Sequence, residues 1–235
     1  MKKKNLKHKI SALILTALIS TAGFFGCSDS TVAPQADNLS FSIMSSTDSI
    51  GDSQNILVLD TVKILIKDIK LNVANNNEDL KNFKVGPFVL FLNLSSSINY
   101  ISTAIIPAGS YDKVKFEVHK LEDIEAIPDP EFADANGRYS VIVKGWYLGN
   151  YFVYKSSKSA HQILHFPINV PITAAALSNV TMVVRPYIWF INTSTNLYMD
   201  PNDPANVDNI DNNIKDNIKN NFKAFKDNDR NGLPD

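Results

Sequence analysis

Apolar and polar residues alternate along most of the chain between residues 39 and 193. Leu39, Phe41 and Ile43 occupy every second position between serines, and in residues 113–119 Val and Phe alternate with Lys, Glu and His. A period of two places successive side chains on opposite faces of a strand. Each of these runs therefore predicts a strand with one buried and one exposed face.

Other runs rich in β-branched and aromatic residues predict further strands at 56–73, 83–94, 100–106, 139–146, 151–155, 161–170 and 180–191. Within 56–73 the apolar positions shift by one residue near Lys67 and Asp68, which predicts a bulge or a bend between two strands. The two runs around Leu148-Gly149-Asn150 predict a hairpin. Residues 121–137 are acidic and contain two prolines, so we expect a surface loop whose carboxylates are solvated or, alternatively, serve as oxygen ligands.

Many short strands with turn signals between them, and no helical period before the end, predict an antiparallel, immunoglobulin-like β-sandwich or a barrel over residues 39–193. Residues 194–235 are expected to form one amphipathic helix and an acidic tail. The helical stripe consists of Val207, Ile210, Ile214, Ile218, Phe222 and Phe225. Asp203-Pro204 offers an N-cap followed by proline in the first turn. Because the polar face is rich in asparagine, a poor helix former, we expect the helix to depend on docking against the sandwich.

The first 27 residues have the layout of an export signal, with five lysines before an apolar core at 10–19 and small residues after it. The segment ends in Phe24-Phe25-Gly26-Cys27, which resembles the lipobox of bacterial lipoproteins. That resemblance implies cleavage before Cys27 and attachment of lipid, palmitate included, to this residue. The alternative is an incidental cysteine in an uncleaved anchor, but the apolar run is shorter than the ~20 residues that span a bilayer. Residues 28–38 are polar and predict a flexible tether.

Composition limits the remaining possibilities. Cys27 is the one cysteine in 235 residues, so no internal disulfide can form. The formal net charge is −1, which argues against a nucleic-acid partner because such proteins carry basic patches. No nucleophile elbow, phosphate-binding loop, dinucleotide fingerprint or zinc-protease helix is present in the sequence, and we expect a protein that is not an enzyme.

Residues 105–114, Ile-Ile-Pro-Ala-Gly-Ser-Tyr-Asp-Lys-Val, place a turn between two strands and follow the strand at 62–73. This arrangement resembles an uncharacterised family of bacterial cell-envelope lipoproteins, a domain of unknown function. The resemblance implies a prealbumin-like β-sandwich and implies fold more than function, since the shared motif is a turn.

The C-terminal segment carries the strongest local signal for a ligand. Asp227, Asp229 and Asn231 alternate before Gly232, as in the first half of an EF-hand-type calcium loop. By this spacing those three residues are side-chain ligands, Leu233 offers its carbonyl, and Asp235 stands where a water-mediated ligand sits. The carboxylates follow the predicted helix, whose negative dipole end favours a cation. The sequence therefore predicts a weak calcium site, with a solvated acidic tail as the alternative.

Aromatic residues gather at the predicted hairpin. Trp146, Tyr151 and Tyr154 could form a platform on which sugar rings stack, although core packing is the more common role of such residues. His161 and His165 are four residues apart, but on a strand this spacing separates them by about 13 Å, too far for one metal ion.

Together these features predict an exported, membrane-anchored lipoprotein of the cell envelope, and we expect the outer membrane. Its β-sandwich would act as a non-catalytic module that binds a glycan or another envelope protein. The alternative is a structural subunit of a surface fibre or adhesin that assembles by β-strand augmentation. Self-association of the purified domain would favour this second hypothesis.

Overall fold

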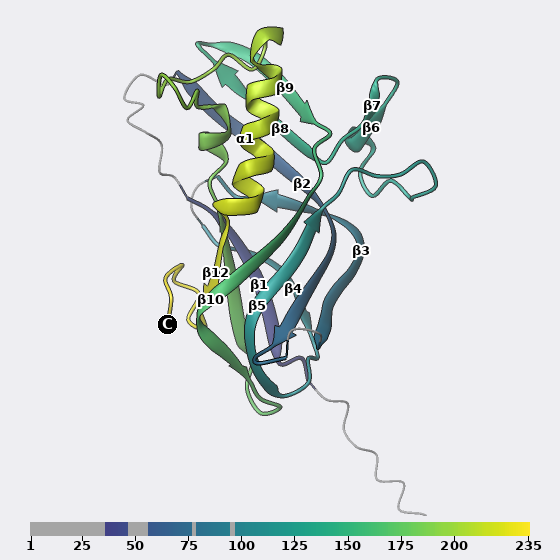
Figure 1. Cartoon of the computed structure of the whole chain (residues 1–235), viewed down its shortest axis with the longest axis vertical. Helices are drawn as coiled ribbons and strands as arrows, with labels where there is room; N and C mark the ends of the chain where they lie inside the picture. Colours follow the sequence, from purple (N-terminus) through teal and green to yellow (C-terminus); the bar gives the residue numbers. More distant parts are fainter. Residues whose placement is uncertain (1–35, 47–55, 77–78, 95–96) are drawn as a thin grey trace, which may run out of the picture. The chain divides into compact units, whose positions relative to one another are not determined.

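The computed structural model describes residues 36–46, 56–76, 79–94 and 97–235, and Figure 1 shows their arrangement. The predicted signal segment with Cys27, and residues 28–35 of the predicted tether, lie outside the described residues. The strands of the two main sheets are β1 (Leu39–Ser45), β2 (Leu57–Val73), β3 (Leu80–Leu92), β4 (Asn99–Ala104), β5 (Gly109–Val118), β8 (Val141–Tyr147), β9 (Asn150–Ser156), β10 (Ala160–Ile172), β11 (Ser178–Val184) and β12 (Lys223–Lys226). The other elements are the hairpin of β6 (Ala133–Asp134) and β7 (Gly137–Arg138), the 3-10 helices η1 (Pro130–Phe132), η2 (Pro186–Phe190) and η3 (Pro204–Asn206), and the α-helix α1 (Val207–Asn220).

Two sheets share one hydrophobic core, which confirms the prediction of a mainly β sandwich with one C-terminal helix. One sheet has four strands in the order β12-β11-β1-β4, and the other has six, in the order β10-β5-β2-β8-β9 with β3 also paired to β2. One pair departs from the antiparallel prediction, because β1 and β11 run parallel, with Leu39 opposite Ser178 and Ser45 opposite Val184. Parallel neighbours need a long connection, and here the chain between them builds the whole six-stranded sheet.

β2 is the strand on which the six-stranded sheet is built. It pairs with β3 along one edge, while its first half pairs with β8 and its second half with β5 along the other edge. The register shifts between Ile66 and Asp68, where the sequence predicted a change of phase. The predicted bulge is therefore confirmed, and the two predicted strands are one continuous strand.

The helix α1 closes one end of the core, as Figure 1 shows, with three isoleucines that are fully buried: Ile210, Ile214 and Ile218. The Asn213 amide donates to the carbonyl oxygens of Trp189 (3.0 Å) and Ile191 (2.7 Å), so one asparagine also fastens the helix to the sandwich. The predicted cap is confirmed in position, since Asp203 accepts from the Ala205 N–H at 2.9 Å in η3, which leads into α1.

Two predicted boundaries are wrong. The helix ends at Asn220 and does not continue to Phe225, because the next residues form β12, in which Ala224 lies opposite Met182 of β11. The strand predicted at 180–191 ends at Val184, because Pro186 lacks an N–H for the ladder and begins η2. Trp189, in that 3-10 helix, is fully buried. Within the described part of the chain, no helix has the length and apolarity needed to cross a bilayer.

Candidate functional site

The β8–β9 hairpin carries an exposed aromatic pair. Its turn residues Leu148 and Gly149 have φ of 48° and 79°, the left-handed values of a two-residue type I′ turn. This turn places Trp146 opposite Tyr151, with ring centroids 5.2 Å apart and planes 65° from parallel. The two residues are 43% and 49% exposed. The Trp146 indole N–H donates to Asp60 Oδ2 on β2 at 2.9 Å, so the ring is held in one orientation.

Tyr154, the third residue of the predicted platform, lies on the opposite face of β9 and is only 5% exposed. Its hydroxyl oxygen is 3.0 Å from both the Val207 carbonyl oxygen and Asp211 Oδ1, under α1. Burial, and next the charge of Asp211, raise the pKa of Tyr154. The prediction that Tyr154 belongs to the platform is therefore wrong: this residue fastens the helix, and the platform consists of Trp146 and Tyr151.

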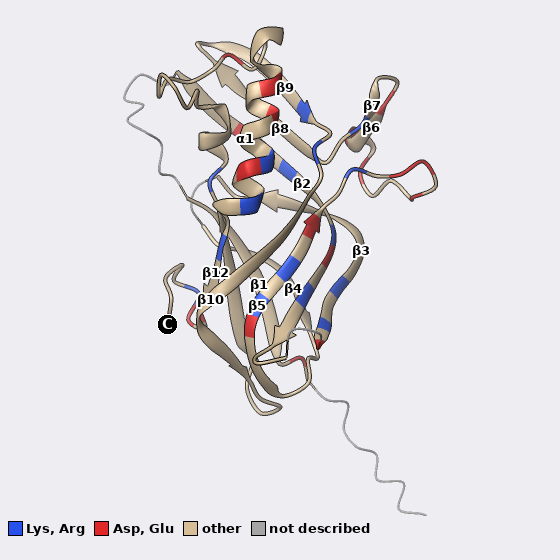
Figure 2. Cartoon of the chain, in the orientation of Figure 1, with Lys and Arg blue, Asp and Glu red and all other residues tan. Residues whose placement is uncertain are grey.

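The acidic loop between β5 and β8, whose acidic positions are red in Figure 2, is not simply solvated, because most of its carboxylates contact lysine, arginine or histidine side chains. The pairs are Asp123–Arg138, Glu125–His119, Asp129–Lys63, Glu131–Lys144 and Asp134–Lys155. These contacts bind η1 and the β6–β7 hairpin onto the outer face of β2, β8 and β9. The acidic loop is thus an ion-paired cover beside the aromatic pair.

Two of these carboxylates meet lysines of the sheet at short range. Lys63 Nζ lies 2.7 Å from Asp129 Oδ2 and 2.8 Å from Glu131 Oε2. The hydrogen bond from Lys63 lowers the pKa of Asp129, and bonds from Lys144 and Lys63 lower the pKa of Glu131. Both carboxylates are therefore ionised at neutral pH, and neither has the raised pKa that a general acid requires.

The predicted calcium loop begins where β12 ends. Asp227 is fully buried, and its carboxylate accepts from Thr181 Oγ1 (2.7 Å), Asn231 N (2.9 Å) and Gly232 N (3.2 Å). Gly232 has φ +84°, a left-handed conformation that favours glycine, and an added Cβ would lie 2.9 Å from Met44 Sδ, so the methionine side chain would have to move. The loop is thereby packed against the outer face of the four-stranded sheet.

The structure brings three of the predicted ligands together. One carboxylate oxygen each from Asp227, Asp229 and Asp235 lies within 4.8 Å of the others. Asn231 and Leu233 bond within the loop, since the Asn231 side-chain oxygen accepts from the Leu233 N–H at 2.7 Å. A set of oxygen donors suits calcium, a hard cation. Lys226, however, already contacts Asp235 at 2.9 Å, and this bond lowers the pKa of Asp235.

One argument for this site is wrong. The three carboxylates follow strand β12 and not the end of α1, so the helix dipole does not act on them. Sequence reasoning also missed the second layer of this site, Thr181 and Asn179, whose side chains bond to Asp227 from β11. These two residues belong to a strand far away in the sequence, and no local signal relates them to the loop.

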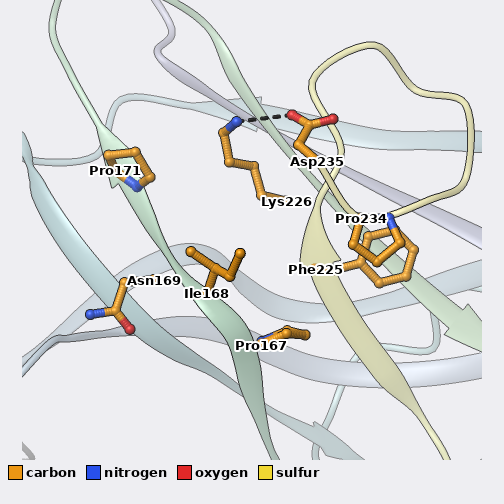
Figure 3. Close-up of a pocket in the computed structure, with 8 residues that line it drawn as sticks. All are labelled: Pro167, Ile168, Asn169, Pro171, Phe225, Lys226, Pro234 and Asp235. Carbon is orange, nitrogen blue, oxygen red and sulfur yellow. Dashed lines mark hydrogen bonds and ion pairs between the residues drawn. The ribbon is translucent and has the colours of Figure 1, made fainter.

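A groove of about 230 Å³ lies beside this loop, between the facing edge strands β10 and β12 (Figure 3). Three prolines, Pro167, Pro171 and Pro234, line it together with Ile168 and Phe225. The register of β10 with β5 breaks between His165 and Val170, next to these prolines. The sequence signal for this groove is Pro167 in the predicted strand at 161–170 and Pro171 just after it, since proline lacks the N–H donor that would join two strand edges.

Two of the histidines lie on a strand, as predicted. His161 and His165 both lie on β10, and His161 Nε2 is 3.7 Å from Glu117 Oε1. The prediction that His119 lies on the exposed face of the strand at 113–119 is wrong, because this residue follows β5 and is buried. Its Nε2 lies 2.6 Å from Glu125 Oε2 and holds the start of the acidic loop. Among the described residues, one group of at least three His, Cys, Asp or Glu residues has its ligand atoms within 4.8 Å of one another. This group is Asp227, Asp229 and Asp235.

Comparison with known proteins gives no further constraint on this site. No protein-family model, curated protein or solved structure matches the chain.

Proposed function

We propose that this chain is a lipid-anchored protein of the cell envelope whose β-sandwich is a non-catalytic binding module. The observation that carries the proposal is the Trp146–Tyr151 pair, which is exposed on the outer face of the β8–β9 hairpin and oriented by Asp60. An aromatic ring held in place without a covering partner suits the apolar C–H face of a sugar, while neighbouring polar groups bind its hydroxyls. We therefore propose a glycan as the ligand, in preference to an envelope protein.

Glycan-array binding of the exported chain, followed by titration of any sugar retained, tests this proposal. Trp146→Ala and Tyr151→Ala should each weaken binding about tenfold, since one aromatic contact contributes roughly 1–1.5 kcal/mol. Trp146→Phe should weaken binding less, because it keeps one aromatic ring while losing part of the indole surface and the bond to Asp60. Tyr100→Ala, an exposed aromatic on β4 of the other sheet, is the matched control and should bind as the wild type does. Equal binding by all four variants would remove the hairpin from the proposal.

The lipid anchor is supported by the lipobox-like Phe24-Phe25-Gly26-Cys27 segment and by the resemblance to envelope lipoproteins. Two or more acyl chains give stable membrane attachment, whereas one does not. Cells that produce the chain should incorporate labelled palmitate into it, and Cys27→Ser should abolish the label. Protease treatment of intact and permeabilised cells would then show which side of the outer membrane carries the sandwich.

We also propose that the loop from Asp227 to Asp235 binds calcium weakly. Support comes from the three carboxylates within 4.8 Å, whose mutual repulsion a divalent cation would relieve. Loops of this kind in extracellular modules have Kd of about 10⁻⁴–10⁻³ M, so about 10 mM calcium should raise the Tm by a few degrees. Magnesium is the control cation, and Asp229→Asn should remove the calcium effect. An unchanged Tm in calcium would contradict this proposal without affecting the glycan platform.

The second candidate function, a structural subunit that assembles through strand pairing, is favoured by one specific observation: β9 ends its sheet order and presents exposed side chains. Pairing of this edge with the same edge of a second copy gives a dimer, whereas assembly into a fibre has no end. A fibre needs two separate edges that pair with each other.

A further inference from the structure

β9 ends the order of the six-stranded sheet, and its free edge carries a regular row of backbone groups. All seven residues of β9 pair with β8 without a shift in register. Because the hairpin closes through a two-residue turn, Asn150 forms a hydrogen-bonded pair with Tyr147, and such pairs recur at every second residue. The N–H and C=O groups of Tyr151, Val153 and Lys155 therefore point away from β8.

The other terminal strands carry devices that hinder edge pairing. β10 contains Pro167 and Pro171 and has a broken register, and β12 has only four residues with a lysine at each end. β3 contains Gly86 and Pro87, and β4 has only six residues. β9 has seven residues, no proline and no glycine. Among the terminal strands of the described sheets, β9 is thus the one best able to accept another strand.

A charged side chain on an edge strand normally prevents pairing, and Lys155 is the one such residue on β9. Its ammonium group lies 2.6 Å from Asp134 Oδ2 and 4.8 Å from the centre of the Tyr139 ring. The lysine is therefore neutralised and folded onto its own molecule, so its charge does not protect the edge.

We propose that β9 pairs antiparallel with β9 of a second copy of this chain, with Val153 on the twofold axis. This register places Val153 opposite its own copy and Tyr151 opposite Lys155 of the other molecule. Val153 is 46% exposed, and pairing would cover it with Val153 of the second copy. In this register the one charged residue of each strand, Lys155, lies opposite an uncharged tyrosine, so no like charges meet across the pair. The six outward backbone groups on each strand would all gain partners.

This pairing forms a closed dimer and not a fibre. A twofold contact uses the same edge of both molecules, so nothing remains at that edge for a third copy. The two sheets would become one continuous sheet, with both Trp146–Tyr151 pairs on one face and both α1 helices on the other. Two glycan sites on one face would give bivalent binding, but the pairing itself does not depend on the proposed glycan ligand.

Crosslinking in cells that produce the full chain tests the geometry directly. Cα atoms of a directly opposed hydrogen-bonded pair lie about 5.5 Å apart, within the range that a disulfide bridges. Val153→Cys should therefore give a disulfide-linked dimer on a non-reducing gel. Val85→Cys is the matched control, because Val85 is an exposed valine, 69% accessible, on β3. The wild-type chain, which retains Cys27, measures any crosslinking through that residue.

Charge reversal tests whether position 153 meets itself. Two differently tagged full-length copies should co-purify as wild type, and this should be lost when both carry Val153→Lys or both carry Val153→Glu. One lysine copy with one glutamate copy should restore co-purification, which also shows that both variants fold. The proposal is overturned if tagged wild-type copies do not co-purify. It is also overturned if the lysine–lysine pair associates as the wild type does, or if Val85→Cys crosslinks as readily as Val153→Cys.

Discussion

At the scale of single residues, Asp227 connects the C-terminal loop to the sandwich. Its buried carboxylate accepts one bond from a side chain of β11 and two from backbone N–H groups of its own loop. Asp227→Ala would leave these donors without an acceptor, and hydrogen bonds to charged groups contribute more than neutral ones. We expect a loss of about 3 kcal/mol in the free energy of unfolding, measured by urea denaturation without calcium. Asp229→Ala, at an exposed position of the same loop, should cost less than about 0.5 kcal/mol. Equal losses would show that the carboxylate of Asp227 is not what holds the loop.

Tyr154 should make stability depend on alkaline pH. Burial raises the pKa of its hydroxyl above the ordinary value of 10.0, so the folded state resists ionisation that the unfolded state allows. The stabilisation is fully present below the unfolded pKa and is lost as pH rises toward the folded pKa, by up to about 1.4 kcal/mol per pH unit. Tyr154→Phe should remove the part of the pH dependence of the unfolding free energy above pH ~10 that comes from this hydroxyl. It should also cost roughly 1 kcal/mol at neutral pH, because the hydrogen bond of the hydroxyl is lost. Chemical denaturation at a series of pH values measures both effects, and an unchanged alkaline slope would contradict the assignment.

The residues of the hairpin show what sequence could and could not predict at this scale. Strand periodicity places Trp146 and Tyr151 on one face once the two-residue turn is known, and it places Tyr154, three residues after Tyr151, on the other. Strand periodicity alone therefore excludes Tyr154 from the platform of Trp146 and Tyr151. Asp60, which orients Trp146, was not predictable, because its contact depends on how β2 pairs with β8 across 86 residues.

At the scale of elements, Gly145 is a test of the β2–β8 pairing. A Cβ built on this glycine would lie 2.1 Å from the Val58 carbonyl oxygen, at the point where the register shifts between Leu59 and Thr61. Gly145→Ala must displace backbone, and overpacking of this kind typically costs about 1–3 kcal/mol. Gly109→Ala is the control, because its Cβ would meet only a tyrosine carbon at 3.7 Å. Thermal unfolding should show a clearly lower Tm for the first variant alone, and a wild-type Tm for both would contradict the close approach.

Helix α1 should owe its stability to docking. Its polar face is rich in asparagine, so the intrinsic helix propensity is poor, and the buried stripe must supply the stabilisation. Ile214→Ala, at a fully buried position, should cost about 2–5 kcal/mol, whereas Asn212→Ala on the exposed face should be neutral or slightly stabilising. Hydrogen exchange of the α1 amides in both variants measures this difference. Strong protection in the Ile214→Ala variant would show that the helix holds without its anchor.

The same helix explains the largest error in the predicted elements. Phe222 and Phe225 continue the helical spacing, so periodicity alone extends the helix through them. In the structure, the edge of β11 offers backbone partners to residues 223–226, and pairing there forms β12. A neighbouring strand edge is a tertiary feature, and no local pattern reports it.

At the scale of the whole molecule, the sequence predicted strands and fold class well but not how the sandwich closes. Alternation identifies which face of a strand is buried, and it does not identify the neighbour. The parallel pair of β1 and β11, with Ser40 bonded to Asn179 at a separation of 139 residues, has no local signature. The groove between β10 and β12 and the carboxylate cluster around Asp227 both depend on how β11 pairs with β1 and β12. No local sequence pattern reports this pairing, so the candidate sites were only partly predicted.

The pairing of β1 with β11, which lies far away in the sequence, should also set the order of folding. β1 lies between β11 and β4 and cannot complete its sheet until the end of the chain is available, so its pairing carries a large loop-closure cost. The β8–β9 hairpin, closed by a two-residue turn, can form early. We expect Ile43→Val in β1 mainly to speed unfolding, with a φ-value near zero, and Val143→Ala in β8 mainly to slow folding, with a φ-value above about 0.5. Stopped-flow denaturant kinetics on both variants measure these values. A φ-value near one at Ile43 would mean that the parallel pair forms first, and that the hairpin is built onto an existing sheet.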